Sequence, residues 1–243
     1  MHRFFVPPED FSNGTVTIRG PDVNHIRTVL RMKPGDRIGV LDGRGQRFEV
    51  ELTGLTKDEV TGEIVSQSAV QTESPIEIAM GQALIKGNGF DNLVRKSVEL
   101  GVHSIWPLKS HRCVAEVSPG SHKLERWQRI AEEAAKQCGR THIPAVHSPV
   151  RSVEEYCREV ADCDLKLVFW EGESTVRLHE IENEKPVSSI AFAAGPEGGW
   201  TAAEIDGFRQ QGFRTVSLGP RILKADAASL VILSLLQHRW GDL

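Results

Sequence analysis

Two strand-like runs that end abruptly on glycine and proline constrain this chain more than any other feature. The apolar run Ile190 to Ala194 stops at Gly195, and the run Arg214 to Leu218 stops at Gly219-Pro220. Glycine adopts backbone angles closed to other residues, so both breaks allow a close approach to the backbone. Ligands of open α/β sheets bind at strand ends, so the pair of breaks predicts a small-molecule pocket.

Helices are expected after both breaks. Thr201 and Glu204 form the Thr-x-x-Glu pattern of a capping box, and an apolar helix is expected from about Ala225 to His238. This last helix is apolar around more of its circumference than one core-facing stripe requires. Burial on both sides within one subunit would explain that breadth, and so would a second subunit.

The chain shows two kinds of periodicity. Residues 1–71 alternate apolar and polar positions as short strands do, with one short helix expected from Asp22 to Arg31 and Val29 among its inward residues. The polar segment 71–75 ends in proline and is the predicted linker. Strand and helix patterns alternate through residues 76–243, which is typical of a parallel α/β sheet with helices on both faces. We therefore expect two domains, 1–71 and 76–243.

The formal net charge of −4 is unevenly distributed. Lys and Arg outnumber Asp and Glu by seven to three over residues 19–47 and by ten to six over 86–140, whereas the ratio is ten to fifteen from residue 141 onward. Basic stretches of this kind are compatible with nucleic acid, although such clusters are more often solvated faces.

The composition argues against a membrane, metal or disulfide role. No run approaches the ~20 apolar residues of a membrane span, and no secretory signal pattern begins the chain, so we expect a cytoplasmic protein without a membrane partner. The four cysteines form no Cys-x-x-Cys pair, so reduced, buried thiols and no metal site are expected. Cys138 is placed on the buried stripe of a helix ending there.

The segments GPEGGWTAAEI and SLGPRILKADAA together resemble the paired signature of the SPOUT-class RNA methyltransferases. With HRFFV, HIRTVLRMKPGD, KSVELGV, AKQCGR and QHRWGDL, the resemblance covers nearly the whole chain. It is specific to the family that methylates N3 of a uridine in small-subunit (16S) ribosomal RNA, the RsmE type. One departure is clear: where the family has Leu-Arg-x-Glu-Thr-Ala, this chain reads Leu-Lys-Ala-Asp-Ala-Ala from Leu223 to Ala228.

The resemblance implies a SPOUT-type α/β domain with a parallel sheet and a C-terminal trefoil knot, preceded by a small PUA-like β-barrel that holds RNA. It implies S-adenosyl-L-methionine as cofactor and a homodimer through the C-terminal helix. The expected cofactor-binding residues come from three loops at strand ends and are Phe169, Trp170, Glu171, Gly195, Pro196, Glu197, Gly198, Gly199, Leu218, Gly219, Arg221, Ile222 and Leu223.

The candidate catalytic residues are Arg221, Lys224 and Asp226. Arg221 offers a planar fork of donors for a carbonyl or a phosphate. Asp226 is equally compatible with a base, an ion pair and a subunit contact. Glu197 is expected to orient its loop or cap the following helix rather than act as the base.

The expected partner is small-subunit ribosomal RNA within an assembled or nearly assembled subunit. Candidate RNA-binding residues lie in or beside the basic stretches, and Arg140 among them is also suited to complement a helix dipole. They are His25, Arg27, Arg31, Lys33, Arg44, Arg47, Lys86, Arg112, Gln137 and Arg140.

Two other functions fit the sequence. The changes at Lys224, Asp226 and Ala227 would suit a ribosome-assembly RNA-binding protein that has lost catalysis. The second alternative is a SPOUT methyltransferase that acts on another target, such as a ribose 2′-hydroxyl. The N-terminal barrel and the form of the first glycine loop argue against this alternative.

Overall fold

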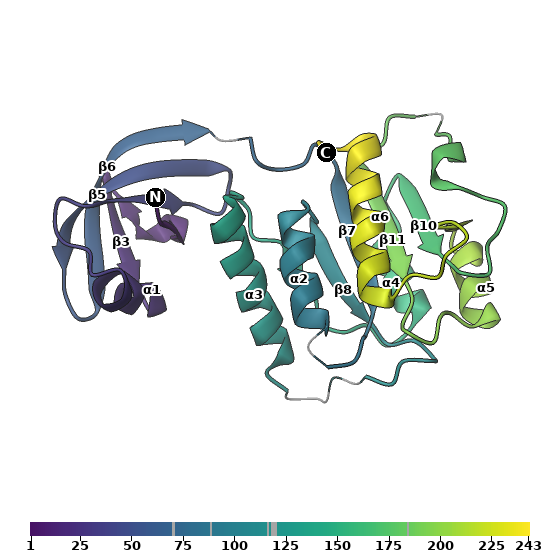
Figure 1. The fold of residues 1–243 in the computed structure, drawn as a ribbon. Coiled ribbons are helices and arrows are strands. Elements are labelled where there is room, and N and C mark those ends of the chain that lie inside the picture. Colours follow the sequence, from purple (N-terminus) through teal and green to yellow (C-terminus); the bar gives the residue numbers. More distant parts are fainter. Residues whose placement is uncertain (70, 88, 116, 118–120, 184) are drawn as a thin grey trace. The chain divides into compact units, whose positions relative to one another are not determined.

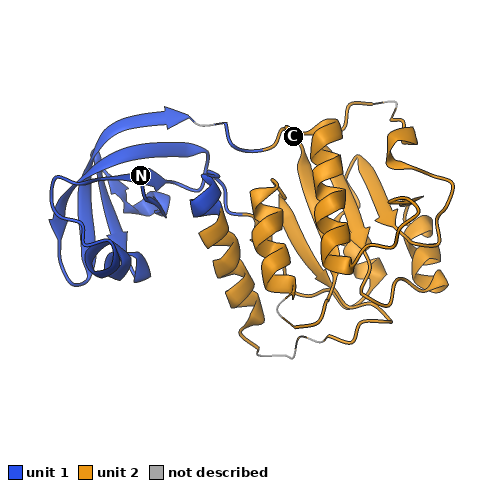
Figure 2. Cartoon of the chain, viewed as in Figure 1, with its two compact units in different colours: residues 1–73, 135–143 blue, residues 74–134, 144–243 orange. Residues whose placement is uncertain are grey.

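The computed structural model describes residues 1–69, 71–87, 89–115, 117, 121–183 and 185–243. The chain forms two compact units (Figure 2). The first contains Met1–Glu73 and Ala135–Ile143, and the second contains Ser74–Ala134 and Pro144–Leu243. The segment Ala135–Ile143 thus joins the first unit although it lies far beyond the predicted linker in sequence.

The first unit is a six-stranded sheet in the order β1-β4-β5-β6-β3-β2. Only the β1–β4 pair is parallel among the pairings of the described residues. Most of the alternating positions, such as Val40, Val50 and Val60, face one core that also contains Phe4 and Ile26, whereas Val65 is exposed. The strands are β1 Arg3–Phe5, β2 Phe11–Ser12, β3 Thr15–Arg19, β4 Arg37–Leu41, β5 Gln46–Leu55 and β6 Glu59–Ala69, and a short 3₁₀ helix, η1, covers Pro8–Asp10.

The short helix of the first unit differs from the prediction. It begins as an α-helix, α1 (Pro21–Asn24), and continues as a π-helix, η2 (His25–Val29), in which the Leu30 N–H donates to the His25 carbonyl at 2.9 Å. A π turn holds more residues than an α turn, so positions three apart no longer share a face. Ile26 is therefore buried, whereas Val29 is 65% exposed, and its predicted inward orientation is wrong.

The second unit is built on a six-stranded, fully parallel sheet in the order β12-β10-β11-β7-β8-β9 (Figure 1). This confirms the predicted parallel α/β class. Its strands are β7 Glu77–Ala83, β8 Ser104–Leu108, β9 Ala145–Val146, β10 Leu165–Phe169, β11 Ser189–Ala194 and β12 Arg214–Val216. Its helices are α2 Gly89–Glu99, α3 Lys123–Cys138, α4 Val153–Glu159, η3 Leu178–Glu180, α5 Ala202–Gln210 and α6 Ala225–Trp240, and the last turn of α3 belongs to the first unit.

Helices cover both faces of this sheet. On one face α4 and α5 bury Tyr156 and Phe208 against the strands, and on the other α6 packs against α2 and β11. The Tyr156 hydroxyl lies within hydrogen-bond distance of the Phe192 carbonyl (2.9 Å) and the Ala79 carbonyl (3.2 Å). Gly81 makes room for the ring, since a β-carbon there would lie 2.5 Å from it.

Two further observations bear on the composition. Among the described residues no helix is both long enough and apolar enough to span a bilayer. Cys157 is buried and Cys113 and Cys163 are half-buried, but Cys138 is exposed, so its predicted burial is wrong. It lies in the last turn of α3, where that helix has left the core of the second unit.

Candidate functional site

A pocket of about 930 Å³ lies in the second unit, at the carboxyl ends of three strands. Its size suits a small molecule or cofactor. Its walls come from the segments after β10, β11 and β12, the start of α6 and the residues after β7.

The sheet order explains why these segments meet. β12, β10 and β11 are neighbours and run parallel, so their carboxyl ends lie at one edge of the sheet. β7 lies on the other side of β11 and brings Ile85 and Lys86 to the same edge. The pocket is thus a consequence of strand order, which places loops distant in sequence side by side.

The loop after β11 requires glycine. Gly199 has a φ of +69°, and a β-carbon on it would collide with the carboxylate of Glu171. A β-carbon on Gly198 would lie 3.1 Å from the β-carbon of Arg112, and one on Gly195 would lie 3.2 Å from the indole nitrogen of Trp200. Glycine at these positions therefore lets the loop pack closely against Glu171, Arg112 and Trp200.

Side chains from neighbouring loops fix this glycine loop in place. The Lys86 backbone N–H donates to Glu197 Oε1 at 3.0 Å, so Glu197 orients the loop, as predicted. Arg112 Nη1 donates to the Gly198 carbonyl at 2.9 Å. After the loop, the predicted capping box is confirmed, with the Thr201 N–H donating to Glu204 Oε2 at 2.8 Å and the Glu204 N–H donating to Thr201 Oγ1 at 3.3 Å.

The loop after β10 is ordered by Glu173. Its carboxylate accepts hydrogen bonds from the Thr175 hydroxyl and N–H, the Thr215 hydroxyl and the Val176 N–H at 2.7 to 3.2 Å. These bonds, from Thr175 first, lower the pKa of Glu173 to about 2, so the group is ionised at neutral pH. The loop is thereby held against β12.

The segment between β12 and α6 closes the pocket. Gly219 has a φ of +108°, and its N–H donates to Ser217 Oγ at 3.2 Å in a tight turn. Arg221, Lys224 and Asp226 then line the pocket with exposed side chains. The helix α6 begins at Ala225 without a side-chain cap from Lys224, and its residues Ala225, Asp226 and Ala228 line the pocket.

This chain is similar to known proteins over nearly its whole length. Residues 72–237 match the model of an RNA methyltransferase domain, and residues 18–65 match that of an RNA methyltransferase PUA domain. The ribosomal RNA small subunit methyltransferase E of Synechocystis is 34% identical and aligns over 96% of this chain and 76% of its own. This chain belongs to that methyltransferase family.

Solved structures of the family agree in fold. That of ribosomal RNA small subunit methyltransferase E from Neisseria gonorrhoeae, bound to S-adenosyl methionine, is 35% identical, with a TM-score of 0.90 over 100% of this chain and 99% of the other. A methyltransferase from Legionella pneumophila, in complex with the cofactor SAM, is 32% identical, with a TM-score of 0.89 over 99% of this chain and 98% of the other. The predicted fold class, a SPOUT-type sheet with a PUA-like N-terminal domain, is therefore confirmed.

All thirteen residues expected to bind the cofactor line this one pocket, together with the three catalytic candidates. The structure thus brings together residues that the sequence placed in three separate loops. Which of them contact a ligand stays a prediction.

The expected RNA-binding residues are more scattered. In the first unit His25, Arg27, Arg31, Lys33 and Arg44 are exposed and Arg47 is half-buried, and Gln137 is exposed in the last turn of α3. In the second unit Lys86 lines the pocket. Arg112 is exposed, but its guanidinium binds the glycine loop: Nη1 donates to the Gly198 carbonyl and lies 3.5 Å from the Trp200 carbonyl.

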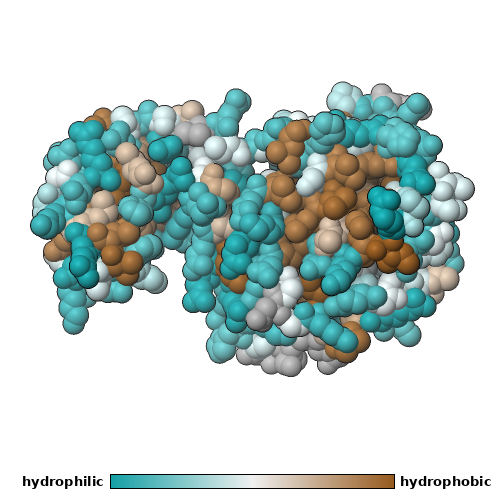
Figure 3. Space-filling model, viewed as in Figure 1, coloured by the Kyte–Doolittle hydropathy of each residue, from teal (hydrophilic) through white to brown (hydrophobic). Residues whose placement is uncertain are grey.

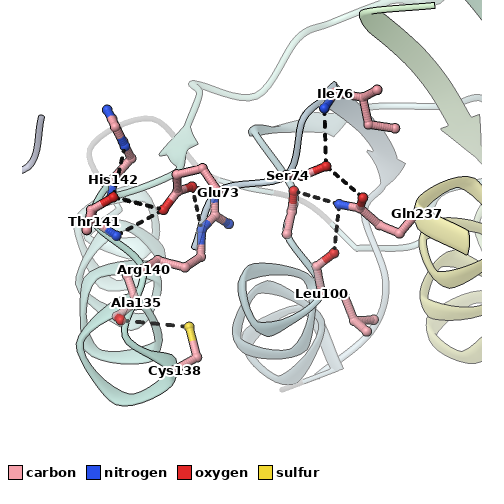
Figure 4. Close-up of polar contacts among 11 residues, drawn as sticks. Glu73, Ser74, Ile76, Leu100, Ala135, Cys138, Arg140, Thr141, His142 and Gln237 are labelled. Carbon is pink, nitrogen blue, oxygen red and sulfur yellow. Dashed lines mark hydrogen bonds and ion pairs between the residues drawn. The ribbon is translucent and has the colours of Figure 1, made fainter. Parts of the chain in front are cut away.

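The prediction that Arg140 contacts RNA is not supported by its position in the structure. It is 6% exposed, and its Nε and Nη2 donate to Glu73 Oε2 at 2.9 and 2.6 Å (Figure 4). Glu73 Oε1 also accepts from the backbone N–H groups of Thr141 (2.9 Å) and His142 (3.2 Å). A guanidinium this buried and bound to a carboxylate holds Ala135–Ile143 within the first unit rather than offering charge to a ligand.

The pocket also contains residues that the sequence reasoning missed. Glu173, Ser174 and Arg177 follow β10, and Ile85 follows β7. Arg177 is half-buried beside Gly219. Their position in the chain could have identified them. Phe169 to Glu171 were expected at the end of a strand, and the charged residues that follow in the same loop could have been predicted to line the same pocket. Gly89, Ala194, Ser217, Pro220, Ala225, Ala228 and Ile232 complete the lining.

Proposed function

We propose that this protein transfers the methyl group of S-adenosylmethionine to N3 of a uridine in small-subunit (16S) ribosomal RNA. The observation that carries the proposal is that the three loops after β10, β11 and β12 meet around one pocket. Family membership and the cofactor bound in the Neisseria and Legionella structures support it.

The residues present fit the cofactor. The glycine loop offers backbone groups at close range, Gly199 cannot bear a side chain there, and the lining combines Phe169, Trp170 and Leu223 with polar groups. When bound, S-adenosylmethionine would supply an activated methyl group on its sulfonium centre. The chain's own task is to hold the cofactor and the base in line, which is worth several kcal/mol through orientation alone.

The chemistry at N3 assigns roles to the exposed residues of the pocket. N3 of uracil carries a weakly acidic proton between two carbonyls, so the reaction requires proton removal and stabilisation of negative charge on oxygen. Arg221 is suited to donate to a carbonyl or a phosphate, and Lys224 to add positive charge nearby. Asp226, in the first turn of α6, accepts the Ala227 N–H at 2.8 Å and is held as an exposed carboxylate. We keep a base, an ion pair and a subunit contact as its three possible roles.

RNA recognition is assigned to the first unit. N3 lies on the pairing edge of the base, so the target must be unpaired or extruded. We propose that residues 1–71 bind the RNA backbone through exposed basic side chains near α1 and η2, and that residues 76–243 carry out the transfer. The substrate form we propose is an assembled or nearly assembled small subunit, which also places the protein in the cytoplasm.

A homodimer through α6 is part of the same proposal. Val231 and Leu235, one helical turn apart on α6, are 39% and 40% exposed, and Ile222 beside the pocket is 87% exposed. Figure 3 shows hydrophobic residues gathered over the face on which α6 lies. A two-fold contact through this surface would bury these side chains and bring two pockets close to the interface.

We also propose the trefoil knot. The chain leaving β12 pairs at Ser217 with Arg177, and Arg239 at the far end of α6 donates to the Leu178 and Ile181 carbonyls. The segment between β10 and β11 therefore contacts the final segment of the chain at Ser217, near its start, and at Arg239, near its end. These two contacts support a fold in which the final segment threads past the β10–β11 segment.

Cofactor titration and a methylation assay separate the alternatives. Isothermal titration with S-adenosylmethionine, followed by transfer of labelled methyl groups to purified small subunits and nucleoside digestion, should give micromolar binding and labelled 3-methyluridine. Binding with no transfer would favour the assembly protein, and label in a 2′-O-methyl nucleoside would favour the other methyltransferase.

A further inference from the structure

Gln82 is a polar side chain in the apolar interior of the second unit. It lies on β7, is fully buried, and pairs in register with Ala194, the last residue of β11. A methionine or leucine would fill a similar volume without an amide to satisfy. The amide is nevertheless satisfied: Nε2 donates to the Ala83 carbonyl at 2.8 Å and to the Gly195 carbonyl at 3.4 Å, and Oε1 accepts the Ser229 hydroxyl. Burying such a group is costly unless every partner is in place, so the arrangement fixes its neighbours.

These neighbours belong to different walls of the pocket. Gly195 is the first residue of the glycine loop. Because Pro196 has no N–H, the carbonyl of Gly195 is the only hydrogen-bonding group of the peptide that opens the loop. Gln82 donates to this carbonyl and so restrains the orientation of the peptide that opens the loop.

The other neighbour belongs to α6. Ser229 is fully buried and shares its hydroxyl proton between Gln82 and the Ala225 carbonyl at 3.2 Å. Ala225 and Ala228 line the pocket within the same turns of α6, next to Lys224 and Asp226. One amide thus joins the cofactor-side loop to the helix start that carries the candidate catalytic groups.

We infer that Gln82 is a positioning residue of the methyl-transfer pocket, which sets the glycine loop and the first turn of α6 at the spacing that S-adenosylmethionine requires. The inference rests on the proposed function. This role requires a side chain that donates a hydrogen bond to Gly195 and accepts one from Ser229, as a buried amide does.

The test is cofactor affinity of Gln82→Met and Ser229→Ala, measured by isothermal titration with S-adenosylmethionine. Gln82→Met keeps the volume and removes both contacts, so we expect affinity to fall about 10-fold, equivalent to about 1.4 kcal/mol. Ser229→Ala removes one contact and should cost about 3-fold. The double variant should bind no more weakly than Gln82→Met, because both changes break one network.

Ser97→Ala is the matched control. Ser97 is also fully buried, on α2, and its hydroxyl donates to Sδ of Met80 on β7 at 3.5 Å; neither residue lines the pocket. It should lower the melting temperature as the test variants do while leaving the affinity within twofold of wild type. If Gln82→Met fails to fold, Ser229→Ala alone decides the question.

Affinities of both test variants within twofold of wild type, or an equal loss in Ser97→Ala, would overturn the positioning role while leaving the proposed function intact. Failure of the wild-type protein to bind S-adenosylmethionine would overturn the proposed function, and the inference with it.

Discussion

The ion pair between Glu73 and Arg140 should be the strongest single attachment of Ala135–Ile143 to the rest of the first unit. The Arg140 side chain is 7% exposed and that of Glu73 is 25% exposed. Removing one partner of a buried pair costs about 3 to 5 kcal/mol. Because Glu73 keeps some contact with water, we expect Glu73→Gln to lower the free energy of unfolding of the first unit by about 3 kcal/mol at pH 7.

A matched control exists on the surface of the same unit. Glu49 accepts from Arg37 Nη1 at 3.1 Å, but these side chains are 30% and 49% exposed. Exposed pairs contribute about 0 to 1 kcal/mol, so Glu49→Gln should change stability by less than about 1 kcal/mol. The two substitutions are chemically identical and differ mainly in burial.

The pH dependence follows from the titration of Glu73. Burial raises its pKa, but the hydrogen bonds and positive charge of Arg140, with the His142 and Thr141 N–H groups, outweigh burial and lower the pKa below its ordinary value. A carboxyl whose folded pKa is depressed stabilises the fold above its unfolded pKa, about 4.3, and loses that contribution as the pH falls through the folded value. The difference between wild type and Glu73→Gln should therefore be largest above pH 5 and shrink below pH 4.

Urea unfolding can assign the effect to one unit. All five tryptophans lie in the second unit, so their fluorescence reports that unit, whereas far-ultraviolet circular dichroism reports both. Glu73→Gln should shift part of the dichroism transition and leave the fluorescence midpoint nearly unchanged. Equal effects of Glu73→Gln and Glu49→Gln, or a difference that does not vary with pH, would refute the reasoning.

Three other predictions address the site, the RNA and the assembly. Gly198→Val should abolish S-adenosylmethionine binding without unfolding the protein, because the added bulk displaces the glycine loop; wild-type affinity by calorimetry would contradict that placement. Arg27→Glu with Arg31→Glu should weaken binding to ribosomal RNA and reduce its salt dependence, as measured by filter binding, and spare cofactor affinity. Lys57→Glu, an exposed charge change on the turn between β5 and β6, is its control, and an equal loss there would argue against a defined RNA face. Leu235→Glu should yield monomers without methyl transfer, and light scattering that shows a fully active wild-type monomer at micromolar concentration would exclude the dimer.

The pocket was largely predictable from the sequence, because the turns that form it require glycine and proline at particular positions. A strand that ends on glycine and proline, as at Gly195 and Gly219, identifies both a strand terminus and a close approach. The pocket then forms because neighbouring parallel strands bring such termini together. The capping box at Thr201 was predictable for the same reason, being confined to one turn of helix.

Features that depend on distant partners were not predictable. Glu73 and Arg140 are 67 residues apart, and only the fold makes them a pair, so the sequence suggested an RNA contact or a helix-dipole role for Arg140 instead. Gln82 and Ser229 are 147 positions apart in the chain, and nothing local in the sequence marks them as hydrogen-bond partners. The prediction for Val29 was wrong for another reason: a π turn altered the helical period on which its inward orientation was based.

The most direct test of the proposed methyl transfer is the modified-nucleoside content of small-subunit ribosomal RNA from a strain lacking this gene. We predict that 3-methyluridine disappears from that RNA, returns on complementation with the wild-type gene and stays absent with Gly198→Val. An unchanged 3-methyluridine content in the deletion strain would contradict the account, and loss of a different methylated nucleoside would reassign the target.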